Sequence, residues 1–283
     1  MRTITALFVG LGSIGTRHLK NLANLCADRG WTLQADALRS DLTRPLRPGA
    51  AELLHAQYTD LAAAPAHYDM VFITNPTSLH AEALRQVKGR GEALFIEKPI
   101  FSAEQTGLAL DELLPAGQKA YVAAPMRWCG AMLALKDRLP ALHPYCARVI
   151  CSSYLPDWRP GVDYRTVYSA RKALGGGVTI DLIHEWDYLV ELFGVPEKLY
   201  NFKGTYSELE IDSDDLSVYI AKYPTLLAEV HLDYFGRGYR RSIELFCRDG
   251  SYLADFGKGT LTLPDGTVQH YEEDVNRRYE REM

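Results

Sequence analysis

The chain has 283 residues, of which 47% are hydrophobic and 24% are charged, a balance typical of a folded globular enzyme. Its 31 Lys and Arg against 36 Asp and Glu give a formal charge of -5, which argues against nucleic acid and favours small molecules or further subunits as partners. Five cysteines without a C-x-x-C pair argue against a disulfide framework and a zinc site, so we expect no metal and a cytoplasmic protein. We also expect neither a signal peptide nor a membrane span, because the first strand begins close to Met1 and no apolar run approaches about 20 residues.

The first stretch of the chain predicts a dinucleotide-binding turn. Residues 4–9 (ITALFV) form an unbroken apolar run, typical of a strand buried on both faces of a parallel sheet. Three glycines follow in the spacing G-x-G-x-x-G, and apolar residues then recur at helical spacing; a strand-turn-helix without a ligand is the alternative. The first glycine permits a tight turn, the second lets backbone approach a pyrophosphate, and the third lets the helix pack closely on the strand. The expected cofactor contacts at this helix N-terminus are Gly10, Gly12, Ser13, Ile14 and Gly15.

Strands and helices then alternate over the first 124 residues. Further buried strands are expected at residues 31–38, 69–74, 93–96 and 119–124. Helices are expected at residues 50–56, from Ser78, and over 102–114, where Ser102 and Gln105 form a capping box. This alternation predicts an α/β domain with a doubly wound parallel sheet over residues 1–124.

From Cys146 onward the pattern changes to segments of alternating apolar and polar residues, which predicts antiparallel strands. These strands are expected at residues 147–154, 216–223, 226–234, 242–248 and 260–263. One helix is expected within this half, over residues 178–193, directly after three glycines. We therefore expect residues 125–283 to form an α+β domain built on a mostly antiparallel sheet.

Four blocks of sequence, in this order, resemble the Gfo/Idh/MocA oxidoreductases, a family that includes glucose-fructose oxidoreductase and inositol dehydrogenase. The blocks are VGLGSIGTRH at residues 9–18, TNPTSLHAE at 74–82, EKP at 97–99 and GGGVTIDLIHEWDYLVELFG at 175–194. The resemblance implies an N-terminal Rossmann domain and a C-terminal domain that binds substrate and forms a homodimer or homotetramer through its sheet. It also implies hydride transfer between NAD(P) and a sugar-like hydroxyl or carbonyl group.

Lys98 is the first candidate catalytic residue. It directly follows an expected parallel strand, and open α/β sheets bind ligands at the carboxyl ends of their strands. An ammonium group there can hydrogen-bond the reacting oxygen, whereas a surface lysine in a strand-end turn is the alternative. The matching EKP block, whose lysine is catalytic in the family, favours the catalytic role. We expect Glu97 to orient Lys98 within the cofactor site and Pro99 to fix the turn.

Asp181 and His184 are the next candidates, both for catalysis and for substrate binding. They lie three residues apart on an expected helix and so share a face, as do His184 and Asp187. A histidine beside carboxylates is suited to general acid/base catalysis, although a helix-face histidine satisfied by its own neighbours is the alternative. In many family members the aspartate precedes the histidine by four residues, so the resemblance supports His184 more strongly than Asp181.

Further contacts follow from the resemblance and from composition. The family block whose groups line the cofactor matches Asn75, Pro76, Thr77 and His80, with His80 in a structural role. Arg127 resembles an arginine that reaches cofactor or substrate, with a surface ion pair as the alternative.

Ahead of the three glycines lies a segment rich in aromatic and arginine side chains. Such side chains stack on rings and bind carboxylate or phosphate. The segment resembles that of family members in sugar and nonulosonic-acid pathways, and this resemblance implies a sugar, sugar acid or nucleotide-sugar substrate. The expected substrate contacts are Trp158, Arg159, Tyr164, Arg165 and Tyr168. Gly175, Gly176 and Gly177 are expected to let a loop approach the nicotinamide or substrate closely, with a flexible linker as the alternative.

Cofactor choice depends on the end of the second strand. An NAD-selective site usually has Asp or Glu there for the ribose 2′-OH, but here Arg39 and Ser40 follow the strand. Asp36 lies too early, within the strand. Because Arg39 can bind a 2′-phosphate, we expect a preference for NADP. A shift of one residue would bring Asp41 to the ribose and favour NAD.

The sequence therefore predicts an NAD(P)-dependent oxidoreductase acting on a carbohydrate-like alcohol or ketone. Two alternatives stay open: a sensor that binds the dinucleotide without turnover, and a redox-assisted hydrolase or lyase that oxidises its substrate only transiently.

Overall fold

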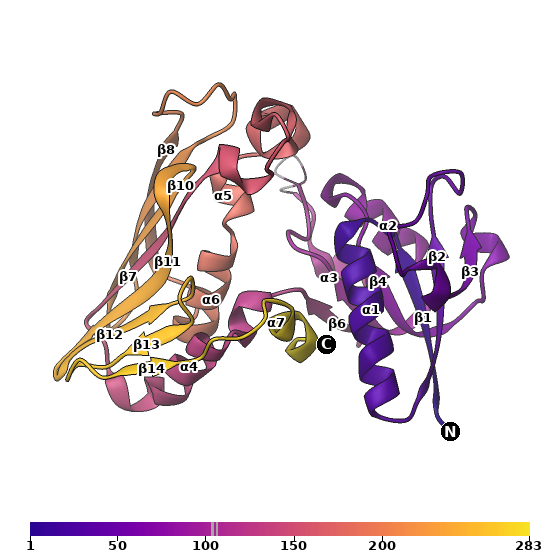
Figure 1. Ribbon diagram of the computed structural model, residues 1–283, viewed down its shortest axis with the longest axis horizontal. Coiled ribbons are helices and arrows are strands. Elements are labelled where there is room, and N and C mark those ends of the chain that lie inside the picture. Colours follow the sequence, from indigo (N-terminus) through magenta and orange to yellow (C-terminus); the bar gives the residue numbers. More distant parts are fainter. Residues whose placement is uncertain (103–104, 106) are drawn as a thin grey trace. The chain divides into compact units, whose positions relative to one another are not determined.

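The computed structural model describes residues 1–102, 105 and 107–283. The chain divides into two compact units (Figure 1). The first unit comprises Met1–Ala123 and Tyr279–Met283, and the second comprises Ala124–Arg278. No helix among the described residues combines the length and the apolar character that crossing a membrane requires.

The first unit is built on a parallel sheet with six strands among the described residues. The strands are β1 (Thr3–Val9), β2 (Thr32–Leu38), β3 (Leu54–Tyr58), β4 (Tyr68–Ile73), β5 (Gly91–Ile96) and β6 (Lys119–Val122). Their order is β3-β2-β1-β4-β5-β6, and every neighbouring pair is parallel. The chain changes direction across the sheet between β1 and β4, which is where doubly wound sheets bind ligands. The predicted doubly wound parallel sheet is confirmed.

Helices cover both faces of this sheet, which explains the unbroken apolar run in β1. Phe8 of β1 belongs to the cluster that contains Leu19 of α1 (Ser13–Asp28). The next side chain along the strand, Val9, belongs to the opposite cluster, with Leu84 of α2 (His80–Gln86) and residues of α3 (Leu110–Leu113). Because successive side chains of a strand point to opposite faces, both faces need apolar residues.

Two expectations for this unit need correction. Residues 50–56 do not form a helix: Ala51–Leu53 is a single 3₁₀ turn and β3 begins at Leu54, because this segment pairs with β2 at the sheet edge. The helix expected over residues 102–114 falls partly on positions 103, 104 and 106, outside the described residues. From residue 107 on, only Leu110–Leu113 is helical. The backbone N–H of Ser102 donates to the side chain of Gln105 at 3.1 Å, as in a capping box.

The second unit is built on a mostly antiparallel sheet, as predicted. Eight strands among the described residues follow the order β14-β13-β12-β11-β7-β10-β9-β8, and only β7 and β10 pair in parallel. The strands are β7 (Cys146–Tyr154), β8 (Lys198–Gly204), β9 (Leu216–Lys222), β10 (Leu227–Asp233), β11 (Phe235–Cys247), β12 (Gly250–Asp255), β13 (Thr260–Thr262) and β14 (Val268–His270). The strands β8, β12 and β14 were not expected; β8 lies exposed at the sheet edge, so it lacks the alternation that burial of one face produces.

Helices lie along one face of this sheet (Figure 1). They are α4 (Gly130–Leu142), α5 (Val178–Asp181) and α6 (His184–Phe193), while α7 (Asn276–Arg281) lies near the C-terminus. Leu135 of α4 and Leu189 of α6 join Val149 of β7 and Val230 of β10 in one buried cluster. The helix expected over residues 178–193 is interrupted between Asp181 and His184, so the two candidate catalytic residues lie on separate helices.

Candidate functional site

The glycine-rich turn of the first unit is closed by its neighbour strand. Gly10 has a φ of +83°, and a Cβ there would lie 2.6 Å from the Cα of Asn75. A Cβ on Gly15 would lie 2.7 Å from both the carbonyl oxygen of Gly10 and Oγ1 of Thr74. The Thr74 hydroxyl donates to the carbonyl of Gly10 at 2.5 Å and so joins the end of β4 to the turn. Gly10 and Gly15 are therefore required by the protein's own packing.

Gly12 differs from the other two glycines. A Cβ on Gly12 would meet no atom within 4 Å, and Gly12 is the N-cap of α1 without a side-chain cap. The first N–H groups of a helix have no partner inside the helix, and here they belong to Ser13, Ile14 and Gly15. Open space in front of uncapped N–H groups at the positive end of a helix fits a pyrophosphate.

The loop after β4 contributes an orphaned polar atom beside this turn. Oδ1 of Asn75 is buried and has no hydrogen-bond partner among the described residues. The buried ring of His80 holds the loop in place: Nε2 lies 2.9 Å from the carbonyl of Asn75 and Nδ1 lies 3.1 Å from the carbonyl of Ile100. Burial lowers the pKa of His80, against the opposing effect of these carbonyls. Pro76 and Thr77 continue the loop into a 3₁₀ turn.

At the end of β2, Arg39 occupies the position that commonly reads the ribose. Its guanidinium donates to Oε1 of Gln57 at 2.7 Å and to the carbonyl of Arg44 at 2.5 Å, both neutral acceptors. Asp36 is 1% exposed and accepts from the hydroxyl of Tyr68 at 2.8 Å, so its carboxylate is used inside the unit. Sequence reasoning placed Asp36 in the strand body, and the structure agrees.

A pocket of about 400 Å³ adjoins Arg39. Its lining includes two further arginines, Arg44 and Arg47, from the loop after β2. Arg44 faces the exposed Asp41 at 3.5 Å, and hydrogen bonds from Thr43 lower the pKa of Asp41. Ser40 lies between Arg39 and Asp41, and its side chain is exposed. The sequence analysis did not single out Arg44 and Arg47, although they follow Arg39 closely in the loop after β2 and could have indicated an anion-binding site.

Lys98 is the second residue after the end of β5, and the side chain of Glu97, between them, holds its backbone. One carboxylate oxygen of Glu97, Oε2, accepts from the N–H of Lys98 at 3.1 Å. The other, Oε1, lies 2.6 Å from Nε2 of His18 on α1. The Lys98–Pro99 peptide bond is cis. Sequence reasoning did not single out His18, which is the last residue of the block at residues 9–18.

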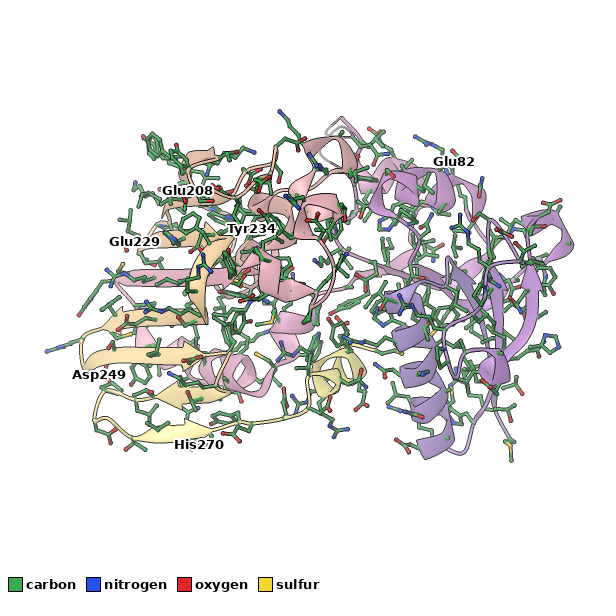
Figure 2. All side chains as sticks on the ribbon, turned by 45° about the horizontal axis from the view of Figure 1, so that its top comes forward. Glu82, Glu208, Glu229, Tyr234, Asp249 and His270 are labelled. Carbon is green, nitrogen blue, oxygen red and sulfur yellow. The ribbon has the colours of Figure 1, made fainter. Side chains whose placement is uncertain are left out.

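In the second unit, Asp181 is clamped by two tyrosines. Its carboxylate is 8% exposed and accepts from the hydroxyl of Tyr168 at 2.6 Å and from that of Tyr234 at 2.5 Å (Tyr234 is labelled in Figure 2). Burial and the neighbouring Asp181 raise the pKa of both tyrosines, so both stay protonated as donors at neutral pH. Tyr234 was not predicted as a site residue, because the sequence showed only that it ends the strand expected over residues 226–234.

His184 is the first residue of α6, and the carboxylate expected beside it is bound elsewhere. Asp187 accepts from Nε of Arg127 at 2.8 Å and from Nη2 at 2.5 Å, and Nη1 of Arg127 reaches Glu191 at 2.8 Å. The Asp187 carboxylate thus receives a bidentate guanidinium, and the role of His184 beside it stays a prediction. Arg127 thus forms an ion pair, which was the alternative to its expected contact with cofactor or substrate.

The aromatic and arginine segment of residues 158–168 is largely bound within its own unit. Nε1 of Trp158 donates to Ser153 at 3.0 Å, and the guanidinium of Arg159 lies 5.8 Å from the ring centre of Tyr168. Arg165 forms ion pairs with Asp163 at 2.9 Å and Glu210 at 3.2 Å. The hydroxyl of Tyr164 accepts the N–H of Glu210 at 3.2 Å.

Two of the three glycines after this segment pack closely against the chain, while Gly175, at a φ of +83°, has no neighbour within 4 Å of a Cβ. A Cβ on Gly176 would lie 2.0 Å from the carbonyl oxygen of Tyr168, and one on Gly177 would lie 2.4 Å from Oδ1 of Asp214. Gly176 and Gly177 therefore lie close against the chain itself, and the approach of this loop to a ligand stays a prediction. No group of three potential metal ligands occurs among the described residues.

Comparisons with known proteins agree with this architecture. Residues 4–123 match the family model described as "Oxidoreductase family, NAD-binding Rossmann fold" (GFO_IDH_MocA). The chain is 24% identical over 272 residues to an uncharacterized oxidoreductase, YrbE, of Bacillus subtilis, covering 92% of this chain and 76% of the relative. It is 26% identical over 200 residues to inositol 2-dehydrogenase of Rhizobium meliloti, covering 68% of this chain and 56% of that enzyme.

Two solved structures share the fold. An oxidoreductase from Agrobacterium radiobacter in complex with NAD+, L-tartaric acid and magnesium gives a TM-score of 0.77 at 16% identity, covering 98% of this chain and 85% of that one. The WlbA dehydrogenase from Bordetella pertussis in complex with NADH and UDP-GlcNAcA gives 0.70 at 18% identity, covering 89% and 78%. With the glycine turn and the Glu97–Lys98–Pro99 block in place, residues 4–123 form an NAD-binding Rossmann domain of the Gfo/Idh/MocA oxidoreductase type, and the relatives that match over longer stretches support this family.

Proposed function

We propose that this oxidoreductase acts on CH–OH groups and transfers a hydride between a nicotinamide cofactor and a carbohydrate-like hydroxyl or carbonyl group. The observation that carries the proposal is the pairing, within one unit, of the open turn at Gly12 with Lys98 at the carboxyl end of β5. The names of relatives support the substrate class, a sugar, sugar acid or nucleotide sugar, since they include an inositol 2-dehydrogenase and a UDP-N-acetylglucosamine 3-dehydrogenase.

The cofactor, when bound, supplies the hydride acceptor or donor. In this proposal the N–H groups of Ser13, Ile14 and Gly15 hold the pyrophosphate, and the free Oδ1 of Asn75 accepts a hydrogen bond from the bound dinucleotide. Lys98 donates a hydrogen bond from its ammonium group to the reacting oxygen, and Glu97 fixes its backbone.

For the second unit we propose His184 as general acid/base, on the strength of the family block that it matches. Asp181 supports it from the clamp of Tyr168 and Tyr234, which keeps the carboxylate in one orientation. The exposed faces of Trp158 and Tyr168 are the proposed contacts for the substrate ring.

We propose NADP as the preferred cofactor. Arg39 has no ion pair among the described residues, and Arg44 and Arg47 line the same pocket together with one carboxylate, Glu52, so the lining carries excess positive charge. A 2′-phosphate is a dianion, and three guanidinium groups suit it better than the hydroxyl of NAD.

We also propose that a second copy of this chain covers the outer face of the sheet, in a homodimer or homotetramer. Tyr200 and Phe202 on the edge strand β8 are 62% and 74% exposed. In register beside them, Ile220 and Val218 line a groove of about 520 Å³. Exposed apolar side chains gathered on one sheet face are typical of subunit interfaces.

The free state of all five cysteines agrees with the proposed cytoplasmic location.

The proposal is tested by incubating the protein with sugars, sugar acids and nucleotide sugars while following the NAD(P)H absorbance band. Turnover with a member of these classes is expected, and Lys98→Ala lowers kcat by about 10²-fold or more while NADPH still binds. Lys88→Ala, in the exposed turn after α2, is the matched control. Bound cofactor without turnover of any of these compounds would instead favour a sensor, and retained turnover in Lys98→Ala would remove Lys98 from the mechanism.

A further inference from the structure

A buried histidine links the cofactor-binding helix to the turn that carries Lys98. Nε2 of His18, on α1, lies 2.6 Å from Oε1 of Glu97. His18 is 0% exposed and Glu97 is 8% exposed, so water does not compete for this contact. Because the contact joins residues 79 positions apart, it fixes α1 against the carboxyl end of β5.

The same carboxylate reaches Lys98. Oε2 of Glu97 accepts the backbone N–H of Lys98 at 3.1 Å, while Oε1 is taken by His18. A carboxylate held at one oxygen can still rotate about its bond to Cγ, but one held at both oxygens cannot. The orientation of the Lys98 backbone, from which its side chain extends, therefore depends on His18 through Glu97.

The remaining surroundings of His18 do not call for a histidine. Its ring packs against Phe95, with 4.8 Å between ring centres, and against the edge of Tyr279 at 6.1 Å. Nδ1 is buried without a hydrogen-bond partner among the described residues. An apolar side chain would make the same ring contacts without burying an unpaired nitrogen. What only the imidazole supplies is the Nε2–H for Glu97, since an ionised carboxylate can only accept.

We propose that His18 is a positioning residue for Lys98, acting through Glu97. This inference rests on the proposed role of Lys98 in the reaction. Outer partners of functional groups commonly change activity by about 10–100-fold when they are removed, although they touch neither substrate nor cofactor. His18 also joins the helix that receives the pyrophosphate to the strand end that carries Lys98, so both parts of the cofactor site share one support.

The test compares His18→Gln with His18→Asn. The amide nitrogen of glutamine can take the place of Nε2, whereas that of asparagine is too short to reach Glu97, and both variants are polar. Leu19→Ala, which empties a fully buried position one residue along α1, controls for a general loss of stability.

The first readout needs no substrate. Hydrogen exchange at the amide of Lys98 in the cofactor-free protein is expected to be about 10-fold faster in His18→Asn, near wild type in His18→Gln, and unchanged relative to neighbouring amides in Leu19→Ala. The second readout is kinetic: His18→Asn lowers kcat by about 10-fold with little change in KM, His18→Gln restores it, and the loss disappears in a Lys98→Ala background.

Equal exchange rates and equal kcat in His18→Asn and His18→Gln would overturn the proposal. The same holds if the kcat of His18→Asn falls only as far as that of Leu19→Ala. Failure of the proposed function is distinguishable, because a wild-type protein without turnover still yields the exchange comparison. If Lys98→Ala stays active while substitution of His18 changes hydrogen exchange at the Lys98 amide, then His18 does position the Lys98 backbone but the reaction does not depend on it.

Discussion

Glu185 on α6 and Arg241 on β11 form a bidentate ion pair inside the second unit. Nε of Arg241 lies 2.7 Å from Oε1 of Glu185, and Nη2 lies 3.0 Å from Oε2. The carboxylate is 0% exposed and the guanidinium side chain is 14% exposed. Because Glu185 directly follows His184, this pair anchors the first turn of α6 to the sheet.

We expect Glu185→Ala to lower the free energy of unfolding by about 3–5 kcal/mol, because it leaves a buried guanidinium without its counter-charge. Glu197→Ala is the control: Glu197 forms an exposed ion pair with Lys222 at 3.2 Å, and its loss costs about 1 kcal/mol or less. Urea unfolding followed by circular dichroism measures both. Similar values for the two variants would mean that Arg241 finds another partner or water.

Gly10 and Gly12 of the turn are expected to respond differently to alanine. Gly12→Ala has room for its Cβ, so unfolding free energy changes by less than about 1 kcal/mol, while NADPH affinity falls about 10-fold as the methyl group occupies the pyrophosphate space. Gly10→Ala is strained at φ +83° and meets Asn75, so it loses stability by more than about 1 kcal/mol. Unfolding curves and nicotinamide fluorescence separate these effects. Unchanged NADPH binding in Gly12→Ala would contradict the assignment of this space.

His184→Ala is expected to reduce kcat by about 10²-fold, because His184 is the proposed acid/base. Asp181→Ala is expected to reduce kcat less. Asp181→Ala should instead lower unfolding free energy by about 1–3 kcal/mol, since the hydroxyls of Tyr168 and Tyr234 lose their acceptor. Tyr234→Phe, which removes one of these hydrogen bonds, serves as the matched control. The reverse order of kcat losses, measured on folded variants, would make Asp181 the principal acid/base.

Arg39→Ala is expected to weaken NADPH binding about 10-fold and to leave NADH binding unchanged, because only NADPH carries the 2′-phosphate. Arg47→Ala should act in the same direction, and Arg85→Ala, on the exposed surface of α2, should affect neither cofactor. Fluorescence titration with both reduced cofactors measures this. Tighter binding of NADH by the wild type would show that Arg39 does not read a phosphate.

Local sequence determined the elements whose burial leaves a periodic pattern. The apolar run of residues 4–9 and the glycine spacing were enough for β1, the turn and α1, because a strand covered on both faces must be apolar throughout. The alternation in β7, β9 and β10 likewise follows from one buried face. The exposed edge strand β8 lacks such a pattern and was missed, and the edge strand β3, which alternates over only five residues, was taken in part for a helix.

Only the tertiary structure decided which side chains become partners. Spacing along a helix placed His184 and Asp187 on one face, but it could not show that Asp187 binds Arg127, which lies 60 residues earlier in the chain. Asp181 meets Tyr234 from 53 residues away, and Glu97 meets His18 from 79 residues away. Such contacts depend on how strands and helices pack, because a carboxylate accepts from whichever donor the fold brings within about 3 Å. The sequence by itself determined the dinucleotide-binding turn and the two sheets, and the folding of distant segments onto one another decided the surroundings of each charged group.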